Sequence, residues 1–409
     1  METIRDDTMS SEPEAKVEKN PFVYYEDGFQ LRLDGSLNGR KAENLDEDTV
    51  GGTVVEQKQK RLSRFFEENT FHHILVLSGA GTSMAAGGKT REGLWNACQQ
   101  EIEVVSEAAE EIDLHGKESG DIEEFLSHAE RLYSVMENNE KLKSAIVALK
   151  KAIRTQCNIV CEGVDDHENL LRKLTARKPG LPRVECFTTN YDTLFEQAAR
   201  KAGFVVIDGF SFSFPRTFSG RYFDLDIVNR ERTRLKGEEN FIPNVFHLLK
   251  LHGSIDWFSK NDGTIEQREC EENAEPLIIY PSSEKYAASY DQPYFEMMSR
   301  FQTALRRDNT LLIVLGFGFA DKHLNNAIIE AVRQNPGFHL LVADYGHPTN
   351  GIDLQKYQDL FGSIGGNISI VHASFCDFVN LLPMNRSYVM PRLELSSVAA
   401  GESRGFRTI

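Results

Sequence analysis

The stretch that decides the fold of this chain is Ile74-Leu75-Val76-Leu77-Ser78-Gly79-Ala80-Gly81-Thr82-Ser83-Met84-Ala85-Ala86-Gly87-Gly88. It opens with four apolar residues without alternation, 74–77, which is typical of a parallel strand covered on both faces. The chain then turns at Gly79-Ala80-Gly81, and the following Thr82 and Ser83 are residue types that cap helices. A strand, a glycine turn and a helix N-terminus predict a cradle for a nucleotide pyrophosphate, because free N–H groups and the helix dipole attract negative charge.

The same stretch has a simpler interpretation, an ordinary tight turn between a strand and a helix. It does not match the dinucleotide fingerprint G-x-G-x-x-G, because Met84 occupies the position of the third glycine or alanine. The glycine loop alone therefore leaves both interpretations open.

Length and charge limit the classes of protein to consider. A chain of 409 residues is long enough for one large α/β domain with insertions, or for two domains. The formal net charge of -16 argues against a general nucleic-acid surface, because phosphate binding draws on clustered Lys and Arg. We therefore expect no direct contact with nucleic acid.

The cysteines and the apolar runs indicate the compartment. None of the 6 cysteines forms a C-x-x-C pair, so we expect no structural zinc ribbon and no bound metal. The N-terminus has no apolar signal-peptide core, and no apolar run reaches membrane-spanning length. These features predict a cytoplasmic protein with reduced thiols and no membrane contact.

The domain organisation follows from changes in composition along the chain. The polar segment 1–60 is predicted to be an N-terminal extension, with a possible role in oligomerisation, and 61–385 the main domain. Within the main domain, 95–177 is predicted to be a helical insertion and 204–245 an irregular loop insertion or mobile lid. The tail 386–409 is expected to be loose.

Strands and helices alternate along the main domain, which predicts a doubly wound parallel, Rossmann-like α/β sheet. The expected strands are 74–77, 184–187, 248–251, 311–315, 340–343 and 368–371, and the expected helices after the insertion are 194–202, 321–332 and 353–361.

Three further strand ends gather polar residues, at the edge where open parallel sheets bind ligands. They are Thr188-Thr189-Asn190-Tyr191-Asp192, His252-Gly253-Ser254 and Gly316-Phe317-Gly318-Phe319-Ala320-Asp321. Each stretch has a structural alternative. Asn190 and Asp192 could cap a helix, His252 could orient a turn, and Gly316 and Gly318 could form a second tight turn. Their repetition after successive predicted strands favours a shared site.

On these motifs the chain resembles the sirtuins. Gly79 to Gly87 matches the sirtuin pattern G-A-G-x-S-x-x-x-G, and Thr188-Thr189-Asn190-Tyr191-Asp192 resembles T-Q-N-I-D. Leu251-His252-Gly253 is similar to the L-H-G that carries the sirtuin catalytic histidine. The resemblance extends over roughly residues 60–375 and implies a site that binds NAD+ as a substrate.

The departures from the sirtuin pattern point to a particular branch. Gly88-Lys89-Thr90-Arg91-Glu92 stands where sirtuins have I-P-D-F-R, so only the arginine is kept, and the four-cysteine zinc module is absent. The stretch from Gly316 to Asp321 is similar to that of sirtuin-like domains in prokaryotic antiphage defence proteins, which hydrolyse NAD. The whole chain looks most like the subunit that assembles with a HerA-type hexameric ATPase.

The resemblance implies an NAD+ glycohydrolase that releases ADP-ribose and nicotinamide. Because a docked peptide is harder to build without the zinc module, water is favoured over acetyl-lysine as the nucleophile. Free hydrolysis of NAD would be toxic, so we expect a homo-oligomer whose activity is gated by the HerA-type ATPase.

The resemblance also implies residue roles. Asn190 would hold the attacking water, Asp192 would position the ribose or the nicotinamide amide, and His252 would act as general base, because free histidine titrates close to neutral pH. The residues expected to bind the nucleotide are Gly79, Ala80, Gly81, Thr82, Ser83, Arg91, Thr189, Gly316, Phe317 and Asp321.

Two other functions remain open from the sequence. The same residues would serve an NAD-dependent protein deacetylase or an ADP-ribosyltransferase. A scaffold that binds NAD or ADP-ribose without turnover is the third hypothesis; Asn190 and His252 weigh against it, because binding alone needs neither.

Overall fold

The computed structural model describes residues 22–26, 29–32, 37–38, 53–109, 120–135, 139–178, 180–229, 241–269, 276–278, 292–345, 351–362 and 365–385. The expected tail 386–409 and most of the expected extension 1–60 lie outside the described residues.

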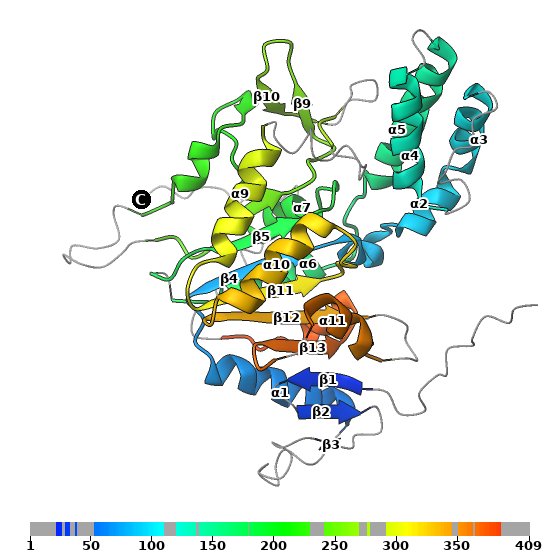
Figure 1. The fold of residues 1–409 in the computed structure, drawn as a ribbon. Helices are drawn as coiled ribbons and strands as arrows, with labels where there is room; N and C mark the ends of the chain where they lie inside the picture. Colours follow the sequence, from blue (N-terminus) through cyan, green and yellow to red (C-terminus); the bar gives the residue numbers. More distant parts are fainter. Residues whose placement is uncertain are drawn as a thin grey trace, which may run out of the picture.

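A ten-stranded sheet forms the centre of the molecule, in the order β3-β2-β1-β13-β12-β11-β4-β5-β8-β6 (Figure 1). The stretch from β13 to β6 is parallel throughout, which confirms the predicted doubly wound sheet. Its strands are β4 (His73–Ser78), β5 (Val184–Thr188), β6 (Val205–Ile207), β8 (Val245–Lys250), β11 (Thr310–Leu315), β12 (Phe338–Asp344) and β13 (Ile368–His372). The antiparallel edge is made of β1 (Phe22–Glu26), β2 (Phe29–Arg32) and β3 (Leu37–Asn38).

Helices cover both faces of this sheet and enclose two apolar cores. One core lies under α1 (Val54–Glu68), α6 (Asp166–Thr175), α7 (Leu194–Ala202) and α12 (Phe375–Leu381). The other lies under α9 (Tyr294–Leu305), α10 (Lys322–Gln334) and α11 (Leu354–Phe361). In β4, Ile74 and Val76 join the first core and Leu75 and Leu77 the second, because successive side chains of a strand point to opposite faces. Burial on both faces explains why this strand is apolar without alternation.

A separate helical module stands beside the sheet (Figure 1). Its helices are α2 (Arg91–Ala97), α3 (Gln99–Ala108), α4 (Ile122–Val135) and α5 (Glu140–Cys157), and they share a third apolar core. The sequence predicted helices across 95–177, and they are present. However, Leu170, Leu171 and Leu174 of α6 belong to the core of the sheet, so the module itself comprises only α2 to α5.

Within segment 1–60, the described strands β1, β2 and β3 form the antiparallel edge of the main sheet. In β1, Tyr24 is fully buried and lies opposite Val371 of β13. The first helix begins at Val54, where Thr53 and Glu56 form a capping box: the Thr53 hydroxyl accepts the Glu56 N–H (3.3 Å) and the Glu56 carboxylate accepts the Thr53 N–H (2.7 Å).

The prediction that 204–245 is an irregular insertion is wrong in part. Val205–Ile207 forms β6, which pairs with β8 and extends the main sheet, because an existing strand edge supplies the hydrogen-bonding partners for a three-residue strand. A small second sheet, β7-β10-β9, follows. Its strands are β7 (Arg216–Thr217), β9 (Trp257–Ser259) and β10 (Ile265–Gln267). None of the described helices has the length and apolar character needed to traverse a bilayer.

Candidate functional site

A cavity of about 540 Å³ opens at the carboxyl ends of β4, β5, β8, β11 and β12. It lies at the point where the chain order of the sheet reverses, because β4 sits between β5 on one side and β11 on the other. Ligands bind at such a switch point in open parallel sheets, and the volume is in the usual range for a small-molecule site.

The cavity brings together almost all of the residues that the sequence singled out. The predicted residues on its wall are Gly79, Ala80, Gly81, Ser83, Arg91, Thr189, Asn190, Asp192, His252, Gly316, Phe317 and Asp321. Thr82 lies behind the wall: it is buried, and its hydroxyl contacts Ser78 and the Gly79 carbonyl. Residues from four separate strand ends therefore share one site.

The α-helix predicted directly after the glycine turn does not form. Two short 3-10 turns, Ala80–Thr82 and Met84–Ala86, follow β4, and the first α-helix begins only at Arg91. The capping prediction fails because Ser83 uses its hydroxyl elsewhere, as a donor to the Asp192 carboxylate (2.6 Å). Gly87, which ends the turn Met84–Ala86 at φ 93°, also disfavours a helix here.

The glycine loop and the loop after β11 pack backbone against backbone. The N–H groups of Gly79 and Gly81 donate to the carbonyls of Leu315 (2.9 Å) and Gly316 (3.0 Å). Gly316 has φ 59°, and a Cβ there would lie 2.6 Å from the Thr82 nitrogen, so only glycine fits. The amides of Gly79 and Gly81 were expected to bind phosphate, but in this conformation each already donates to a backbone carbonyl. What the glycine loop contributes to the cavity is therefore mainly the shape of its wall.

Asn190 links its own loop to the glycine loop. Its amide nitrogen Nδ2 donates to the Gly79 carbonyl (3.0 Å) and the Ser83 hydroxyl (2.9 Å), and contacts the Thr82 hydroxyl at 3.2 Å. Because a carbonyl only accepts, the Nδ2 side must face the glycine loop. The acceptor Oδ1 therefore points away from that loop, on a residue that lines the cavity.

Asp192 has both carboxylate oxygens engaged by the protein. Oδ1 accepts the Leu194 N–H (3.1 Å) at the start of α7, and Oδ2 accepts the Ser83 hydroxyl (2.6 Å). Asp192 thus binds the first amide of α7, although the N-cap residue itself is Thr193. The expected contact of Asp192 with ribose or nicotinamide stays a prediction.

His252 is paired with Asp321 on the wall of the cavity. Its Nε2 lies 3.2 Å from Asp321 Oδ2, while Asp321 Oδ1 accepts the His323 N–H (2.9 Å) and caps α10. A carboxylate beside an imidazole orients the ring and, as the hydrogen-bond partner of one ring nitrogen, helps to set the tautomer. The sequence suggested that Asp321 binds the nucleotide, and the structure adds this pairing with His252, which no local pattern indicated.

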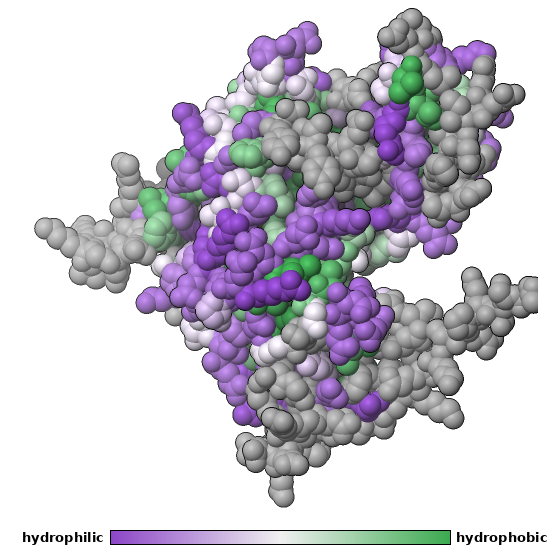
Figure 2. All heavy atoms as spheres, viewed as in Figure 1, coloured by the Kyte–Doolittle hydropathy of each residue, from purple (hydrophilic) through white to green (hydrophobic). Residues whose placement is uncertain are grey.

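The other end of the cavity, at β11 and β12, carries three aromatic residues on its wall. Phe317 and Phe319 stack edge to face at 5.3 Å, and Tyr345 and Tyr357 line the wall. Figure 2 shows apolar surface between hydrophilic surfaces in the region of α10 and α11. This arrangement offers a flat, apolar pocket to a planar ring such as a nucleobase.

Asp344 is a polar group at this end that the sequence analysis did not select. It accepts the Tyr357 hydroxyl (2.7 Å) and lies 3.6 Å from the Lys356 ammonium. Burial, reinforced by Asp344, raises the pKa of Tyr357, so the phenol stays a neutral donor. The available signal was an acidic residue at the carboxyl end of a buried strand, which is where nucleotide-binding sheets hold a ribose hydroxyl.

A second residue that the sequence analysis did not select is Lys250, the last residue of β8. Its signal was a lysine within the apolar run 248–251, and the structure buries it beneath the loops of Asn190 and His252. Among the described residues there is no group of three or more His, Cys, Asp or Glu side chains that could hold a metal ion.

The part of the chain that carries the Asn190, His252 and Asp321 loops has a family counterpart. Residues 184–359 match the SIR2-like domain. The glycine loop after β4 precedes this match. No curated protein matches the chain.

The chain is also similar to solved structures. One is titled "Structure of Sir2Tm bound to a propionylated peptide", with 14% identity and a TM-score of 0.36 over 79% of this chain and 96% of that chain. Another, "The Structural basis for Sirtuin Substrate affinity", has 12% identity and a TM-score of 0.35 over 79% of this chain and 95% of that chain. Identities and scores this low carry no information on the reaction of this chain. The SIR2-like domain match is consistent with NAD-dependent chemistry of the sirtuin type.

Proposed function

We propose that this chain is an NAD+ glycohydrolase, which uses water to cleave the bond between nicotinamide and ribose. The observation that carries the proposal is the meeting of Asn190, His252 and the glycine loop in one nucleotide-sized cavity at the switch point of the sheet. The match of residues 184–359 to the SIR2-like domain supports NAD as the nucleotide.

The proposed reaction needs an acceptor for water and a base. Departure of nicotinamide leaves an oxocarbenium-like ribose carbon, and the oxygen of water forms the new bond to that carbon. Asn190 Oδ1 would accept a hydrogen bond from the water, and the His252–Asp321 pair would take its proton. NAD+ and water thus give ADP-ribose, nicotinamide and a proton.

The rest of the cavity would bind the remainder of the nucleotide. The pyrophosphate would lie along the glycine loop, with Lys89 and Arg91 at the wall as the sources of positive charge. Arg91 also pairs with Asp121 at 3.2 Å, so this guanidinium is already held near the cavity. The adenosine would occupy the aromatic end, between Phe317 and Tyr345.

The deciding experiment is product analysis of NAD+ incubated with the purified full chain, alongside Asn190→Ala and His252→Ala. ADP-ribose and nicotinamide from the wild type alone would support hydrolysis and both residues. Intact NAD+ in every tube, with measurable NAD+ binding, would favour the non-catalytic scaffold. An acetylated peptide that raises turnover and yields O-acetyl-ADP-ribose would favour the deacetylase, and ADP-ribose attached to protein would favour the transferase.

We also propose that assembly gates the activity, with a homo-oligomer of this chain and a HerA-type ATPase as the partner, in antiphage defence by NAD depletion. The support is the motif resemblance and the cost to a cell of ungated NAD hydrolysis. The test is NAD turnover by this chain with and without the ATPase, together with the mass of the complex. Equal turnover and no complex would contradict the proposal.

A further inference from the structure

Lys250 is a buried lysine that the proposed reaction does not use directly. Its side chain is 2% exposed, although lysines are almost never fully buried unless they are paired. Lys250 and its partner Glu196 are not among the residues that line the nucleotide cavity. A role other than contact with the nucleotide must therefore account for this buried ammonium.

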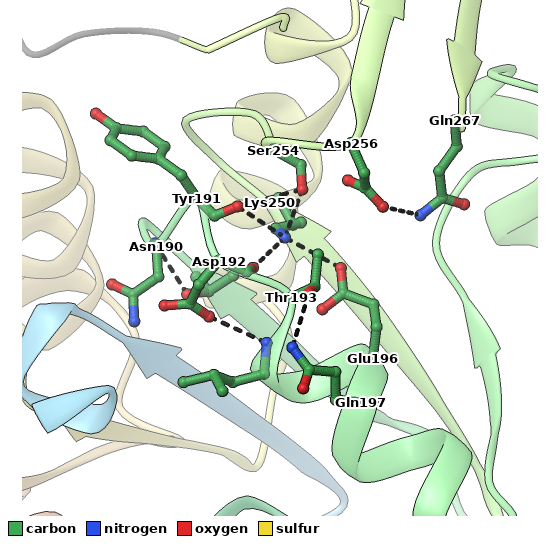
Figure 3. A network of polar contacts seen from close by, with 12 residues as sticks. Asn190, Tyr191, Asp192, Thr193, Glu196, Gln197, Lys250, Ser254, Asp256 and Gln267 are labelled. Atoms are coloured by element: carbon green, nitrogen blue, oxygen red, sulfur yellow. Dashed lines mark hydrogen bonds and ion pairs between the residues drawn. The ribbon is translucent and has the colours of Figure 1, made fainter. Parts of the chain in front are cut away.

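The contacts of the Lys250 ammonium all lie at the base of the site (Figure 3). Nζ donates to the Ser254 hydroxyl (2.7 Å), to the carbonyl of Asp192 and to the Glu196 carboxylate (3.0 Å), and the Tyr191 carbonyl lies at 3.5 Å. A lysine has three N–H donors, so the three shorter contacts use its full capacity.

These partners come from two different loops. Tyr191 and Asp192 follow Asn190 in the loop after β5, whereas Ser254 lies two residues beyond His252 in the loop after β8. One ammonium therefore joins the loop that would hold the water to the loop that would hold the base. The two loops also share a backbone bond, from the Ile255 N–H to the Tyr191 carbonyl (3.1 Å), which Lys250 reinforces with a charge.

Glu196, in the first turn of α7, supplies the opposite charge. Burial raises the pKa of Glu196 to about 7, against the opposing effect of Lys250. Burial also lowers the pKa of Lys250, but the nearby carboxylates of Glu196, Asp256 and Asp192 outweigh it and leave the pKa raised. Each charge thus depends on the other, and removing one alone would leave a buried charge without compensation.

We propose that Lys250, anchored by Glu196, is a positioning residue that holds the Asn190 and His252 loops at the separation needed for reaction, without touching the nucleotide. The proposal rests on the proposed hydrolysis for its catalytic consequence and on the contacts alone for its structural consequence. A displacement of about 1 Å between reacting groups is enough to lower a rate by about 10²-fold.

The decisive variant is the neutral double substitution Lys250→Met with Glu196→Gln. Because it removes both charges, it avoids the stranded carboxylate that Lys250→Met alone would create. We expect a folded protein whose kcat falls by about 10²-fold while the Kd for ADP-ribose changes by less than about twofold. A folded double variant with the wild-type kcat would overturn the proposal.

Lys173→Met is the matched control. Lys173 Nζ also donates to backbone carbonyls, those of Val379 (2.6 Å) and Leu382 (2.8 Å), but it joins α6 to α12 away from the cavity. We expect it to lower the melting temperature and leave kcat unchanged. If Lys173→Met lost as much kcat as the double variant at equal loss of stability, the effect would be one of general stability and the positioning role would be wrong.

Hydrogen exchange separates this proposal from the proposed function. In the double variant, amides of residues 188–194 and 251–256 should exchange faster than in the wild type, whereas amides of α10 should not change. This comparison needs no turnover, so a wild type without NAD hydrolysis would contradict only the proposed function. Unchanged exchange in both loops would contradict the positioning role, whatever the activity.

Discussion

The two ends of the cavity are built by different means. At β5 and β8, Asn190, Asp192 and His252 are each held by hydrogen bonds or an ion pair to another loop, and Lys250 lies beneath them. At β11 and β12 the wall carries the rings of Phe317, Tyr345 and Tyr357, and the Asp344 carboxylate accepts the Tyr357 hydroxyl.

This difference indicates a division of labour. Reacting groups must be held within a fraction of an ångström, which hydrogen bonds and paired charges achieve, whereas binding a planar ring needs mainly apolar surface of the right shape. Substitutions at the polar end should therefore change kcat, and those at the aromatic end should change nucleotide affinity.

The largest effect is expected from His252→Ala. Loss of a positioned base should lower kcat by about 10²–10⁴-fold, while the Kd for ADP-ribose stays within about twofold, because the imidazole serves the reaction rather than binding. Steady-state NAD turnover and calorimetric titration with ADP-ribose measure the two quantities. His72→Ala, which removes an exposed imidazole at the opposite end of β4, is the control. If His252→Ala lost ADP-ribose affinity as well as kcat, the separation of reaction and binding between the two ends would be wrong.

Gly316→Ala should disturb the close backbone contact between the glycine loop and the loop after β11. Its Cβ would lie 2.6 Å from the Thr82 nitrogen, at φ 59°, so we expect a loss of about 3 kcal/mol in the free energy of unfolding and weaker nucleotide binding. Gly263→Ala is the matched control: it has φ 80° but no atom within 4 Å of its Cβ, and should cost only about 1 kcal/mol. Denaturant unfolding of both variants measures the difference, and equal losses would show that the close approach has no energetic consequence.

The buried His167 behind the polar end should make stability depend on pH. It packs edge to face on Phe195 and Phe375, and burial lowers its pKa from 6.5 to about 4, although Asp192 and Asp166 oppose this. The unfolded chain takes up this proton near pH 6.5 and the folded chain only near pH 4. Stability should therefore fall by up to about 3 kcal/mol as the pH drops through this window.

His167→Leu tests this expectation, with unfolding free energies measured between pH 7 and pH 4. On acidification the variant should lose less unfolding free energy than the wild type, and the difference should be the contribution of one titrating histidine. A residual dependence should persist, because burial also lowers the pKa of His73 and of His247 to about 4. Parallel curves for variant and wild type would show that His167 does not titrate as described.

The smallest effect is expected at the aromatic end. Asp344→Asn removes the charge that would bind a ribose hydroxyl, so the Kd for ADP-ribose should rise by about tenfold, or roughly 1.4 kcal/mol, with kcat changed by less than about threefold. Asp359→Asn, on an exposed position of α11, is the control. A fall in kcat without a change in Kd would reverse the roles assigned to the two ends.

The predicted strands are confirmed where the local apolar pattern agrees with the burial that the fold imposes. The run 74–77 is a buried parallel strand, and the runs at 184–187 and 311–315 are its neighbours, because burial on both faces requires continuous apolar sequence. The predictions failed where tertiary contacts overrode local preference. Thr82 and Ser83 are capping residues by type, yet their hydroxyls bond within the site.

By itself the sequence determined which residues stand at the strand ends. Apolar runs specify buried parallel strands, and the polar residues directly after them must gather at one edge of the sheet. Only the tertiary structure decided how those residues pair. His252 meets Asp321 from 69 positions away, and Lys250 meets the Asp192 carbonyl from 58. Such contacts depend on strand order and register, which no local pattern encodes, because hydrophobic burial is non-directional and many pairings of the same strands would satisfy it.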